Sequence, residues 1–458
     1  MMFKYNNKLS KYSIAFCLLV VVVIIFSSKD WRKDNKIIAA DVVSYYAYLP
    51  ATFIFHDLKL EKRETFDKGI FWPEDLPDGN KVIKTTMGMS FLYAPFFFLS
   101  HGTAKLLGME AYGFSAIYKI GLLIGVLVYF FLGLFFLQKI LLRYFPDKLV
   151  ALTTIVIALG TNLLYYTGRE GTMTHLYNFA LINLFVYLSV RWYEKQKFPV
   201  LLLLGALAGL ITLIRPSNIV ILLFFFLYQV YSWRTFIQRI KMVFSRFHWF
   251  LAMGLAFVLI WVPQMIYWYS VTGNLFVDSY PDERFYFGNP HFIDCLFSYR
   301  KGWFVYTPVM LLSVLGMPLL FKRMKEFGFA ISVFFLSATY IIVSWWCWWY
   351  GGSFGMRAFV DYYGILAIPI ALLFSELIKI RKKFFAIVVL ITCIGVAQNL
   401  FFMEKYKKGS LHWDSTTKAS FWNSFFGVHT KPGYWELLRA PDYQKALEGI
   451  DAYADDKK

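Results

Sequence analysis

The sequence predicts an all-α polytopic membrane protein with about 11 transmembrane helices. Of its 458 residues, 58% are hydrophobic, 21% are aromatic and only 17% are charged, a balance far from that of a soluble domain. Apolar runs of roughly 20 residues recur along the chain, and such a run spans the hydrocarbon core of a bilayer. The net charge of +18 falls largely in short segments between these runs, as in loops that orient membrane helices. Nucleic acid is therefore not an expected partner.

The first apolar run, residues 13–26, follows Lys4, Lys8 and Lys11 and is not followed directly by a small-residue cleavage site. We therefore expect an uncleaved anchor rather than a signal peptide. Ten further spans are predicted at residues 117–137, 149–166, 175–190, 199–214, 219–231, 247–269, 303–321, 327–346, 358–378 and 384–403.

One apolar segment, residues 87–107, is ambiguous because it contains Pro95, His101 and Lys105. If it lies along the outer surface, the basic loops fall on the cytoplasmic side together with the N-terminus. If it crosses the bilayer, almost all of them face outward, against the positive-inside rule. We therefore predict a surface helix, with the N-terminus inside and the C-terminus outside. The basic loop residues are Lys139, Arg143, Lys148, Arg191, Lys195, Lys197, Arg234, Arg239, Lys241, Arg246, Lys322, Arg323, Lys325, Lys379, Arg381, Lys382 and Lys383.

The predicted organisation is a transmembrane domain, residues 1–403, followed by a polar C-terminal cap, residues 404–458. The domain contains a first external loop with juxtamembrane helices, residues 28–112, and a second external loop, residues 271–302. No internal repeat is evident, which disfavours a transporter built from inverted repeats, although such symmetry is often weak in sequence.

The first candidate functional residue is Asp41, directly after the first span in the aromatic stretch IIAADVVSYYAYLP, which also contains Tyr45 and Tyr46. A carboxylate at a bilayer surface needs either solvent or a function. The structural alternative is that Asp41 is one more solvated acid in a loop rich in charged residues.

Other ionisable residues gather at the predicted outward ends of the spans, where they are costly unless paired or hydrated. Cations around a few carboxylates suit a lipid phosphate or pyrophosphate, and a carboxylate is then left to activate an acceptor hydroxyl. The candidate substrate-binding residues are Tyr45, Tyr46, Lys84, Arg169, Glu170, His175, Arg215, Asp282, Glu283, Arg300, Lys301, Arg357 and Asp361.

Several of these residues also have structural interpretations. Lys84 and Arg169 suit anchors that extend to the headgroup boundary. His175 suits a hydrogen-bonded packing residue, and Arg215 suits the C-terminal end of a helix. The tryptophans between residues 345 and 349 are typical of an interfacial belt.

No short metal-binding or nucleotide-binding signature is present: the chain lacks HExxH, paired CxxC and GxxxxGK[ST] motifs. The sequence therefore predicts no cofactor with certainty. A divalent metal ion held by Asp41 together with Asp282 or Glu283 is left open, because oxygen ligands from separate loops suit a hard cation.

Together these residues resemble the GT-C superfamily of membrane glycosyltransferases, which includes protein O-mannosyltransferases and the lipid A aminoarabinose transferase. Asp41 stands where that superfamily keeps its catalytic acid. Lys84, with Gly88 and Pro95 after it, resembles the stretch in which a lysine contacts lipid phosphate. Many members carry two adjacent acids in the first loop, whereas here Ala40 and Val42 flank a single one.

Four segments resemble, more specifically, a group of largely uncharacterised transferase-like membrane proteins from Bacteroidota. They read YYAYLPATFIFHDL, LGTNLLYYTGREGTMTHLYNF, LFSYRKGWFVYTP and WWYGGSFGMRAFVDYYG. The resemblance implies a bacterial inner-membrane protein with a periplasmic site.

The expected function is inverting transfer of a sugar from a polyprenyl-phosphate carrier to a glycan, lipid or protein acceptor at the periplasmic face. In this hypothesis Asp41 is the general base or the group that orients the acceptor, and Lys84, Arg215 and Arg357 neutralise the leaving phosphate. His175 and Glu170 shape the pocket. Two alternatives are a transporter or flippase of lipid-linked glycans and a non-catalytic glycolipid-binding relative.

Overall fold

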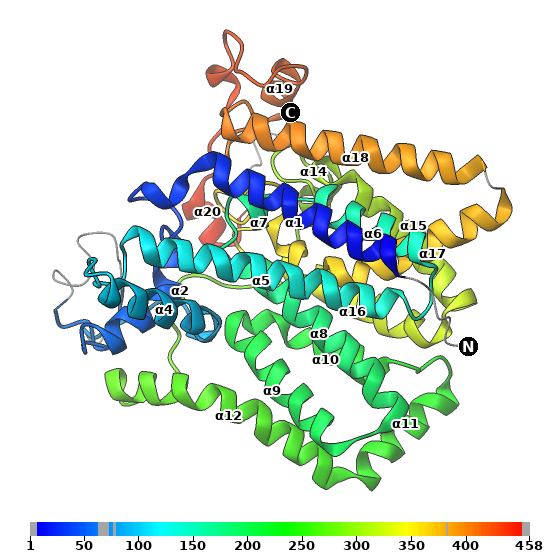
Figure 1. The fold of residues 1–458 in the computed structure, drawn as a ribbon, viewed down its shortest axis with the longest axis horizontal. Coiled ribbons are helices and arrows are strands. Elements are labelled where there is room, and N and C mark those ends of the chain that lie inside the picture. Colours follow the sequence, from blue (N-terminus) through cyan, green and yellow to red (C-terminus); the bar gives the residue numbers. More distant parts are fainter. Residues whose placement is uncertain (1–6, 63–72, 77–78, 382, 451–458) are drawn as a thin grey trace.

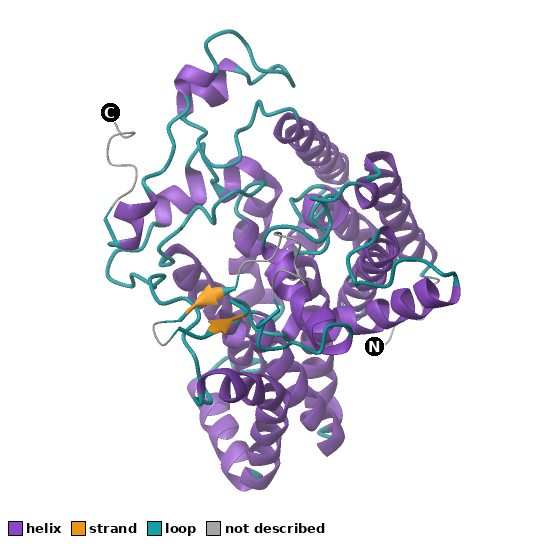
Figure 2. Ribbon diagram, turned by 90° about the vertical axis from the view of Figure 1, so that its left-hand side faces the viewer, coloured by secondary structure: helices purple, strands orange, loops and turns teal. Residues whose placement is uncertain are grey.

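The computed structural model describes residues 7–62, 73–76, 79–381 and 383–450. Outside this range lie Lys4 of the N-terminal segment, the predicted basic loop residue Lys382 and the last part of the predicted cap, 451–458. Apart from one short antiparallel hairpin, β1 (Glu74–Asp75) with β2 (Lys81–Val82), the regular structure of the described residues is helical (Figure 2).

The helices follow one another along the chain as shown in Figure 1. The α-helices are α1 (Lys8–Ser28), α2 (Asp41–Phe53), α4 (Gly88–Leu106), α5 (Ala116–Leu141), α6 (Asp147–Leu159), α7 (Tyr165–Gly168), α8 (Thr174–Lys195), α9 (Phe198–Ile214), α10 (Ile221–Leu227), α11 (Trp233–Ser245), α12 (Phe247–Thr272), α13 (Phe292–Phe297), α14 (Trp303–Tyr306), α15 (Leu311–Arg323), α16 (Lys325–Val343), α17 (Tyr363–Ile380), α18 (Lys383–Lys407), α19 (Lys418–Asn423) and α20 (Tyr443–Leu447). The 3₁₀ helices are η1 (Asp30–Arg32), η2 (Pro216–Val220), η3 (Pro308–Met310), η4 (Arg357–Tyr362) and η5 (Trp435–Leu437).

Within the described residues, 6 helical segments are long and apolar enough to cross a membrane. The all-α prediction is confirmed, and the architecture is compatible with a polytopic membrane protein. The segments are Lys8–Arg32, Ala116–Leu141, Phe247–Thr272, Lys325–Val343, Arg357–Ile380 and Lys383–Lys407.

Several other predicted spans are shorter or interrupted helices. The predicted span 149–166 is divided between α6 and α7, because α6 ends at Leu159 with Gly160 as its C-cap. Pro216 begins η2 ahead of α10, and Pro308 begins η3 ahead of α15. Proline lacks a backbone N–H, so it starts a helical segment more readily than it continues one.

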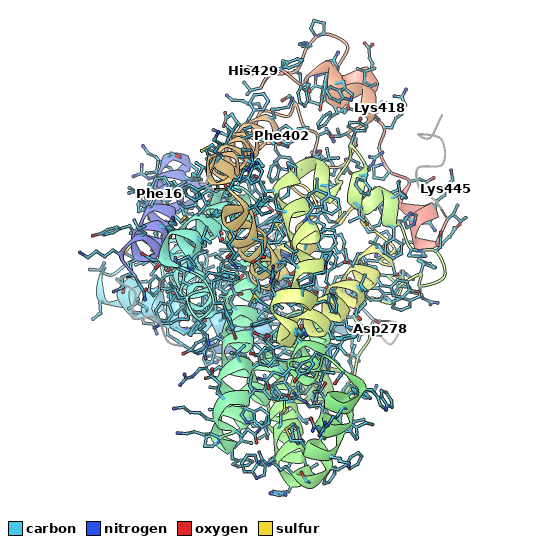
Figure 3. The ribbon with its side chains drawn as sticks, turned by 90° about the vertical axis from the view of Figure 1, so that its right-hand side faces the viewer. Phe16, Asp278, Phe402, Lys418, His429 and Lys445 are labelled. Carbon is cyan, nitrogen blue, oxygen red and sulfur yellow. The ribbon has the colours of Figure 1, made fainter. Side chains whose placement is uncertain are left out.

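The outer helices expose large apolar side chains. Phe16 projects from α1 with 50% of its surface exposed, and Leu259 on α12 and Leu390 on α18 are exposed similarly. Phe402, near the end of α18, is buried instead, and Figure 3 shows both phenylalanines. Such extensive apolar exposure is unfavourable in water and suits contact with lipid.

Helices α9 and α12 pack along one another (Figure 1). At Gly205 and Gly209 of α9, a side-chain carbon would collide with the backbone carbonyls of Met253 and Phe257. Glycine at these two positions therefore allows the two backbones to approach, as small residues do between membrane helices.

The ambiguous segment 87–107 forms one continuous helix, α4, with Pro95 inside it. It packs against α2 and α5 and is not one of the 6 candidate membrane spans of the described chain. Its start is fixed by the Met87 backbone N–H, which donates to Gln264 Oε1 of α12 at 2.8 Å.

The segment that follows α18 is fastened to the loop between α13 and α14 by two buried cations. Arg300 donates through Nη1 to the Arg439 carbonyl at 2.9 Å and to the Asp414 carbonyl. Lys301 Nζ donates to the carbonyls of Ser353 and Trp413. Lys418, His429 and Lys445, labelled in Figure 3, mark the course of the fastened segment.

Burial lowers the pKa of Lys301 to about 7, whereas an unfolded lysine titrates near about 10.4. Between these values the unfolded chain binds the proton and the folded chain does not, so stability rises with pH in this window. Neutral Lys301 keeps two N–H groups, enough for its two carbonyl partners.

We therefore expect the thermal unfolding midpoint to rise less from pH 7 to pH 9 in Lys301→Met than in the wild type. Parallel midpoint-against-pH curves for the two proteins would contradict this.

Candidate functional site

The centre of the candidate site is the fully buried carboxylate of Asp361. Oδ1 accepts a hydrogen bond from His175 Nδ1 at 2.7 Å. Oδ2 accepts from Asn178 Nδ2 at 3.0 Å, Asn218 Nδ2 at 2.9 Å and Arg215 Nη1 at 3.4 Å. Both oxygens are thus occupied, which is what a buried carboxylate needs to remain charged. Asp361 therefore positions its neighbours and is not free to accept a proton from a substrate.

Local structure explains why these residues meet. His175 and Asn178 are three residues apart at the start of α8, so their side chains share one face of that helix. Asn218 lies in η2, the 3₁₀ helix that begins directly after the extended residue Arg215. Helix η4, which carries Asp361, packs against the start of α8.

The same short helix η4 begins with Arg357, whose Nη2 atom lies 3.6 Å from Asp41 Oδ2. The Asp41 side chain is 49% exposed and that of Arg357 is 19% exposed. The Asp41 carboxylate is therefore held beside a guanidinium group while about half of the side-chain surface stays accessible, as a group that exchanges protons with a substrate requires.

Asp41 is the first residue of α2, where the helix dipole favours a negative charge. The residue before it, Ala40, has a φ of +48°, a conformation that residues with a side chain rarely adopt. Strained backbone of this kind concentrates at functional sites. The sharp entry into α2 directs the start of this helix toward η4.

A second carboxylate, Glu170, lies in the turn between α7 and α8 and accepts a hydrogen bond from the Tyr165 hydroxyl at 2.8 Å. Burial raises the pKa of Glu170 and the negative charge of Asp41 adds to this, while Tyr165 and the charge of Arg357 act in the opposite direction. Glu170 is therefore electrostatically coupled to the Asp41–Arg357 pair.

Two tyrosines, Tyr45 and Tyr280, lie near enough to feel the charges of both Asp41 and Arg215. Burial and the nearby Asp41 carboxylate raise the pKa of Tyr45, against the charges of Arg357 and Arg215. Burial also raises the pKa of Tyr280, where the charges of Asp41, Glu283 and Arg215 act as well. Tyr280 therefore feels the charges of both Asp41 and Glu283, and Glu283 belongs to a second group of charged residues.

This second group of charged residues surrounds Lys84, whose Nζ lies 2.9 Å from Glu283 Oε1 and 3.5 Å from Glu74 Oε2. The ammonium also lies 4.9 Å from the centroid of the Tyr280 ring. Burial lowers the pKa of Lys84, but the two carboxylates outweigh this effect and the net shift is upward. Trp346 Nε1 donates to the other Glu283 oxygen at 2.9 Å.

These residues line a cavity of about 160 Å³ that also includes Asp282. At about 30 Å³ for each water molecule, the cavity is large enough for a small hydrated group. The structure thus brings most of the predicted residues into two adjoining clusters: Asp41, Tyr45, Glu170, His175, Arg215, Arg357 and Asp361 in the first, and Lys84, Asp282 and Glu283 in the second.

Four predicted residues have other roles. The Tyr46 side chain is fully buried and packs in an aromatic cluster with Tyr93 and Phe97, with its hydroxyl donating to the Gly113 carbonyl. Arg169 caps α7, and its charge acts on Asp30.

Arg300 and Lys301 hold the C-terminal segment in place. For these two residues the prediction of substrate contact is replaced by a structural role, because their charged groups are buried against backbone carbonyls.

The structure gives no support for a metal site: among the described residues, no group of three or more His, Cys, Asp and Glu side chains is arranged to hold a metal ion. Glu283, one of the two acids considered as a partner of Asp41, instead contacts Lys84 and Trp346.

Three residues that the sequence did not single out belong to the site: Asn178, Asn218 and Tyr280. The spacing of Asn178 from His175 was a usable signal, since residues three apart on a helix share a face. Asn218 and Tyr280 carry no comparable signal, because each reaches the site from a loop or a short 3₁₀ helix.

This arrangement places an accessible carboxylate beside the Arg357 guanidinium. A second guanidinium, that of Arg215, is fixed by the buried Asp361 and acts with Arg357 on Tyr45, and an ammonium group lies in the adjoining cavity. The arrangement suits a phosphate-bearing substrate whose reacting partner must lose a proton. Comparison with known proteins gives no further guide to this chemistry: no family model matches the chain, and no curated protein matches it.

Proposed function

We propose that this protein is a glycosyltransferase of the GT-C type that moves a sugar from a polyprenyl-phosphate carrier to an acceptor hydroxyl. The observation that carries the proposal is the exposed Asp41 carboxylate, 3.6 Å from Arg357 Nη2. Arg215, held by buried Asp361 at 3.4 Å, supplies a second cation to the same region.

In the proposed reaction the acceptor oxygen attacks the anomeric carbon of the sugar, and the bond from that carbon to the carrier phosphate breaks. The bonding electrons leave with the phosphate oxygen, where Arg357 and Arg215 stabilise the charge. Asp41 takes the proton from the acceptor hydroxyl as the new bond forms. Attack opposite the leaving group inverts the anomeric carbon.

The cavity around Lys84 is proposed to hold the remainder of the carrier phosphate or the acceptor. Its cation is already paired with Glu283 and Glu74, so a ligand phosphate would compete with two carboxylates. This favours a role in orienting a substrate rather than in stabilising the leaving group.

The decisive experiment uses the purified full chain, a panel of labelled polyprenyl-phosphate sugars, and wild-type and Asp41→Asn proteins. Transfer by the wild type and its loss in the variant support the proposal. Binding of every donor without transfer by the wild type would favour the non-catalytic alternative, and movement of intact lipid-linked glycan between leaflets would favour the flippase.

We further propose eleven membrane spans, with the interrupted or shorter helices completing the set begun by the 6 long ones. Broken helices are tolerated within a membrane where protein surrounds them, and α6, most of whose residues are buried, fits this condition. The proposed orientation places the N-terminus and the basic loops in the cytoplasm of a bacterial inner membrane, with Asp41 and the C-terminal segment in the periplasm.

Reporter fusions test this topology. We expect a reporter that is active only outside the cytoplasm to work when fused after Met403, because an odd number of spans carries the chain across the bilayer. A fusion after Leu142, in a predicted basic loop, is the matched control and should be inactive. Activity in the opposite pattern would contradict both the surface placement of α4 and the proposed orientation.

A further inference from the structure

A second cleft of about 730 Å³ lies apart from the Asp41 cluster, and no step of the proposed reaction uses it. Its volume is within the usual range for small-molecule sites. The cleft is lined by Tyr144, Tyr193, Glu194, Gln196, Tyr228, Gln229, Tyr231, Thr235, Gln238, Arg239, Met242 and Glu326.

Helix α8 connects the two sites. It carries His175 and Asn178 at its N-terminal end and Tyr193 and Glu194 at its C-terminal end. At 1.5 Å per residue, the 22 residues of α8 measure about 33 Å, close to the thickness of a bilayer core. The cleft and the Asp41 cluster are therefore at opposite ends of the helical bundle (Figure 1).

The neighbouring helix α11 has the character of an interfacial helix. It begins with a capping box formed by Ser232 and Thr235, and none of its residues is buried. Trp233 and Phe244 expose 74% and 73% of their surfaces, while Arg234 and Lys241 are charged. An exposed helix with aromatic and cationic residues suits the headgroup boundary of a bilayer, so the cleft beside it is within reach of lipid headgroups.

The cation of this cleft, Arg239, is only partly satisfied. Nη2 donates to the Tyr228 carbonyl at 2.6 Å, and the guanidinium stacks 3.9 Å from the centroid of the Tyr193 ring. Nη1 is buried and has no hydrogen-bond partner among the described residues. Burial lowers the pKa of Arg239 to about 10, so an anion bound there would relieve the cost of burying this cation.

One of the two acids that line the cleft has no ion-pair partner among the described residues. Glu194 pairs with Arg143 and, at 3.5 Å, with Arg191. The carboxylate of Glu326, in contrast, forms no ion pair within the described part of the chain, and the Glu326 backbone carbonyl accepts a hydrogen bond from Gln229 N at 2.8 Å.

We propose that this cleft binds a zwitterionic headgroup, a phosphate ester carrying a primary ammonium, as part of an aminophospholipid of the bilayer. The phosphate pairs with the Arg239 guanidinium, which lines the cleft. The ammonium pairs with Glu326, beside the tyrosines that also line the cleft. The proposal does not depend on the reaction proposed at Asp41.

The two charges predict selectivity. An anionic phosphatidylglycerol satisfies Arg239 but leaves Glu326 without a partner, whereas phosphatidylethanolamine satisfies both. Phosphatidylcholine brings a cation with no N–H to donate. A charge-assisted hydrogen bond is worth about 1.5–3 kcal/mol, so we expect at least about tenfold preference for phosphatidylethanolamine over the other two.

The test is native mass spectrometry of the delipidated full-length protein with equimolar phosphatidylethanolamine, phosphatidylglycerol and phosphatidylcholine. The wild type should retain phosphatidylethanolamine preferentially, and Glu326→Gln should reduce that preference about tenfold. Arg239→Gln should weaken all three lipids, whereas the exposed control Arg234→Gln on the same helix should change none.

Equal retention of the three lipids by the wild type would overturn the proposal without reliance on any variant, and so would an unchanged preference in Glu326→Gln. A parallel titration with soluble glycerophosphoethanolamine separates the two sources of this headgroup. Binding of the soluble compound as tight as that of the lipid would overturn the assignment to a membrane lipid.

Discussion

Asp41→Asn should reduce sugar transfer by about 10²- to 10⁴-fold, the usual contribution of a general base. The amide keeps the shape of the side chain but cannot take the proton of the acceptor hydroxyl. It also removes the negative charge beside Arg357, 3.6 Å away, so a phosphate-bearing donor should bind at least as well as before. The measurement is single-turnover transfer of labelled sugar together with donor binding.

The matched control is Asp34→Asn, an exposed acid in the segment between α1 and α2. It should leave transfer and binding unchanged, and both variants should accumulate to wild-type levels. If Asp41→Asn transfers sugar at the wild-type rate, Asp41 is not the general base. If the variant protein fails to accumulate, the role of Asp41 is structural.

Asp361→Asn should cause the largest loss of stability, about 3–5 kcal/mol, because removing one partner of a buried ion pair leaves the other charge without compensation. An asparagine at this position also presents an NH₂ group to Asn178, Asn218 and Arg215, all of which donate to the carboxylate. The expected result is a marked fall of the thermal unfolding midpoint in detergent.

The control for this experiment is Asp282→Asn, since Asp282 is an exposed acid. Its unfolding midpoint should match that of the wild type. An Asp361→Asn protein as stable as the wild type would mean that Arg215 does not depend on this anion, and would remove the reason for its fixed position in the site.

The sequence could predict the apolar helices and the charged residues at their ends, because both patterns follow directly from the cost of exposing apolar or charged groups in the wrong solvent. It therefore identified Asp41, Arg215, Arg357 and Asp361. It could not identify Asn218, because a neutral amide in a short 3₁₀ helix is equally suited to a turn. The breaks near Gly160 and Pro308 were likewise hidden within continuous apolar runs.

The roles of Arg300 and Lys301 were unpredictable for another reason. Their partners are backbone carbonyls at Ser353, Trp413 and Arg439, and every residue type supplies a carbonyl, so the pairing leaves no trace in the side-chain pattern. A cation in a loop therefore has the same sequence signature whether it binds phosphate or holds a distant segment in place.

The bonds of Arg300 and Lys301 also impose an order on biosynthesis. Their acceptors follow them by as many as 139 positions, so the ribosome has made almost the whole polypeptide before this loop can reach its final state. Until then both cations must stay hydrated, because burial without acceptors is costly. α18, the last helix long enough to cross a membrane, can therefore be inserted before Arg300 and Lys301 find their acceptors. Folding of this loop is complete only when the segment that follows α18 packs against it.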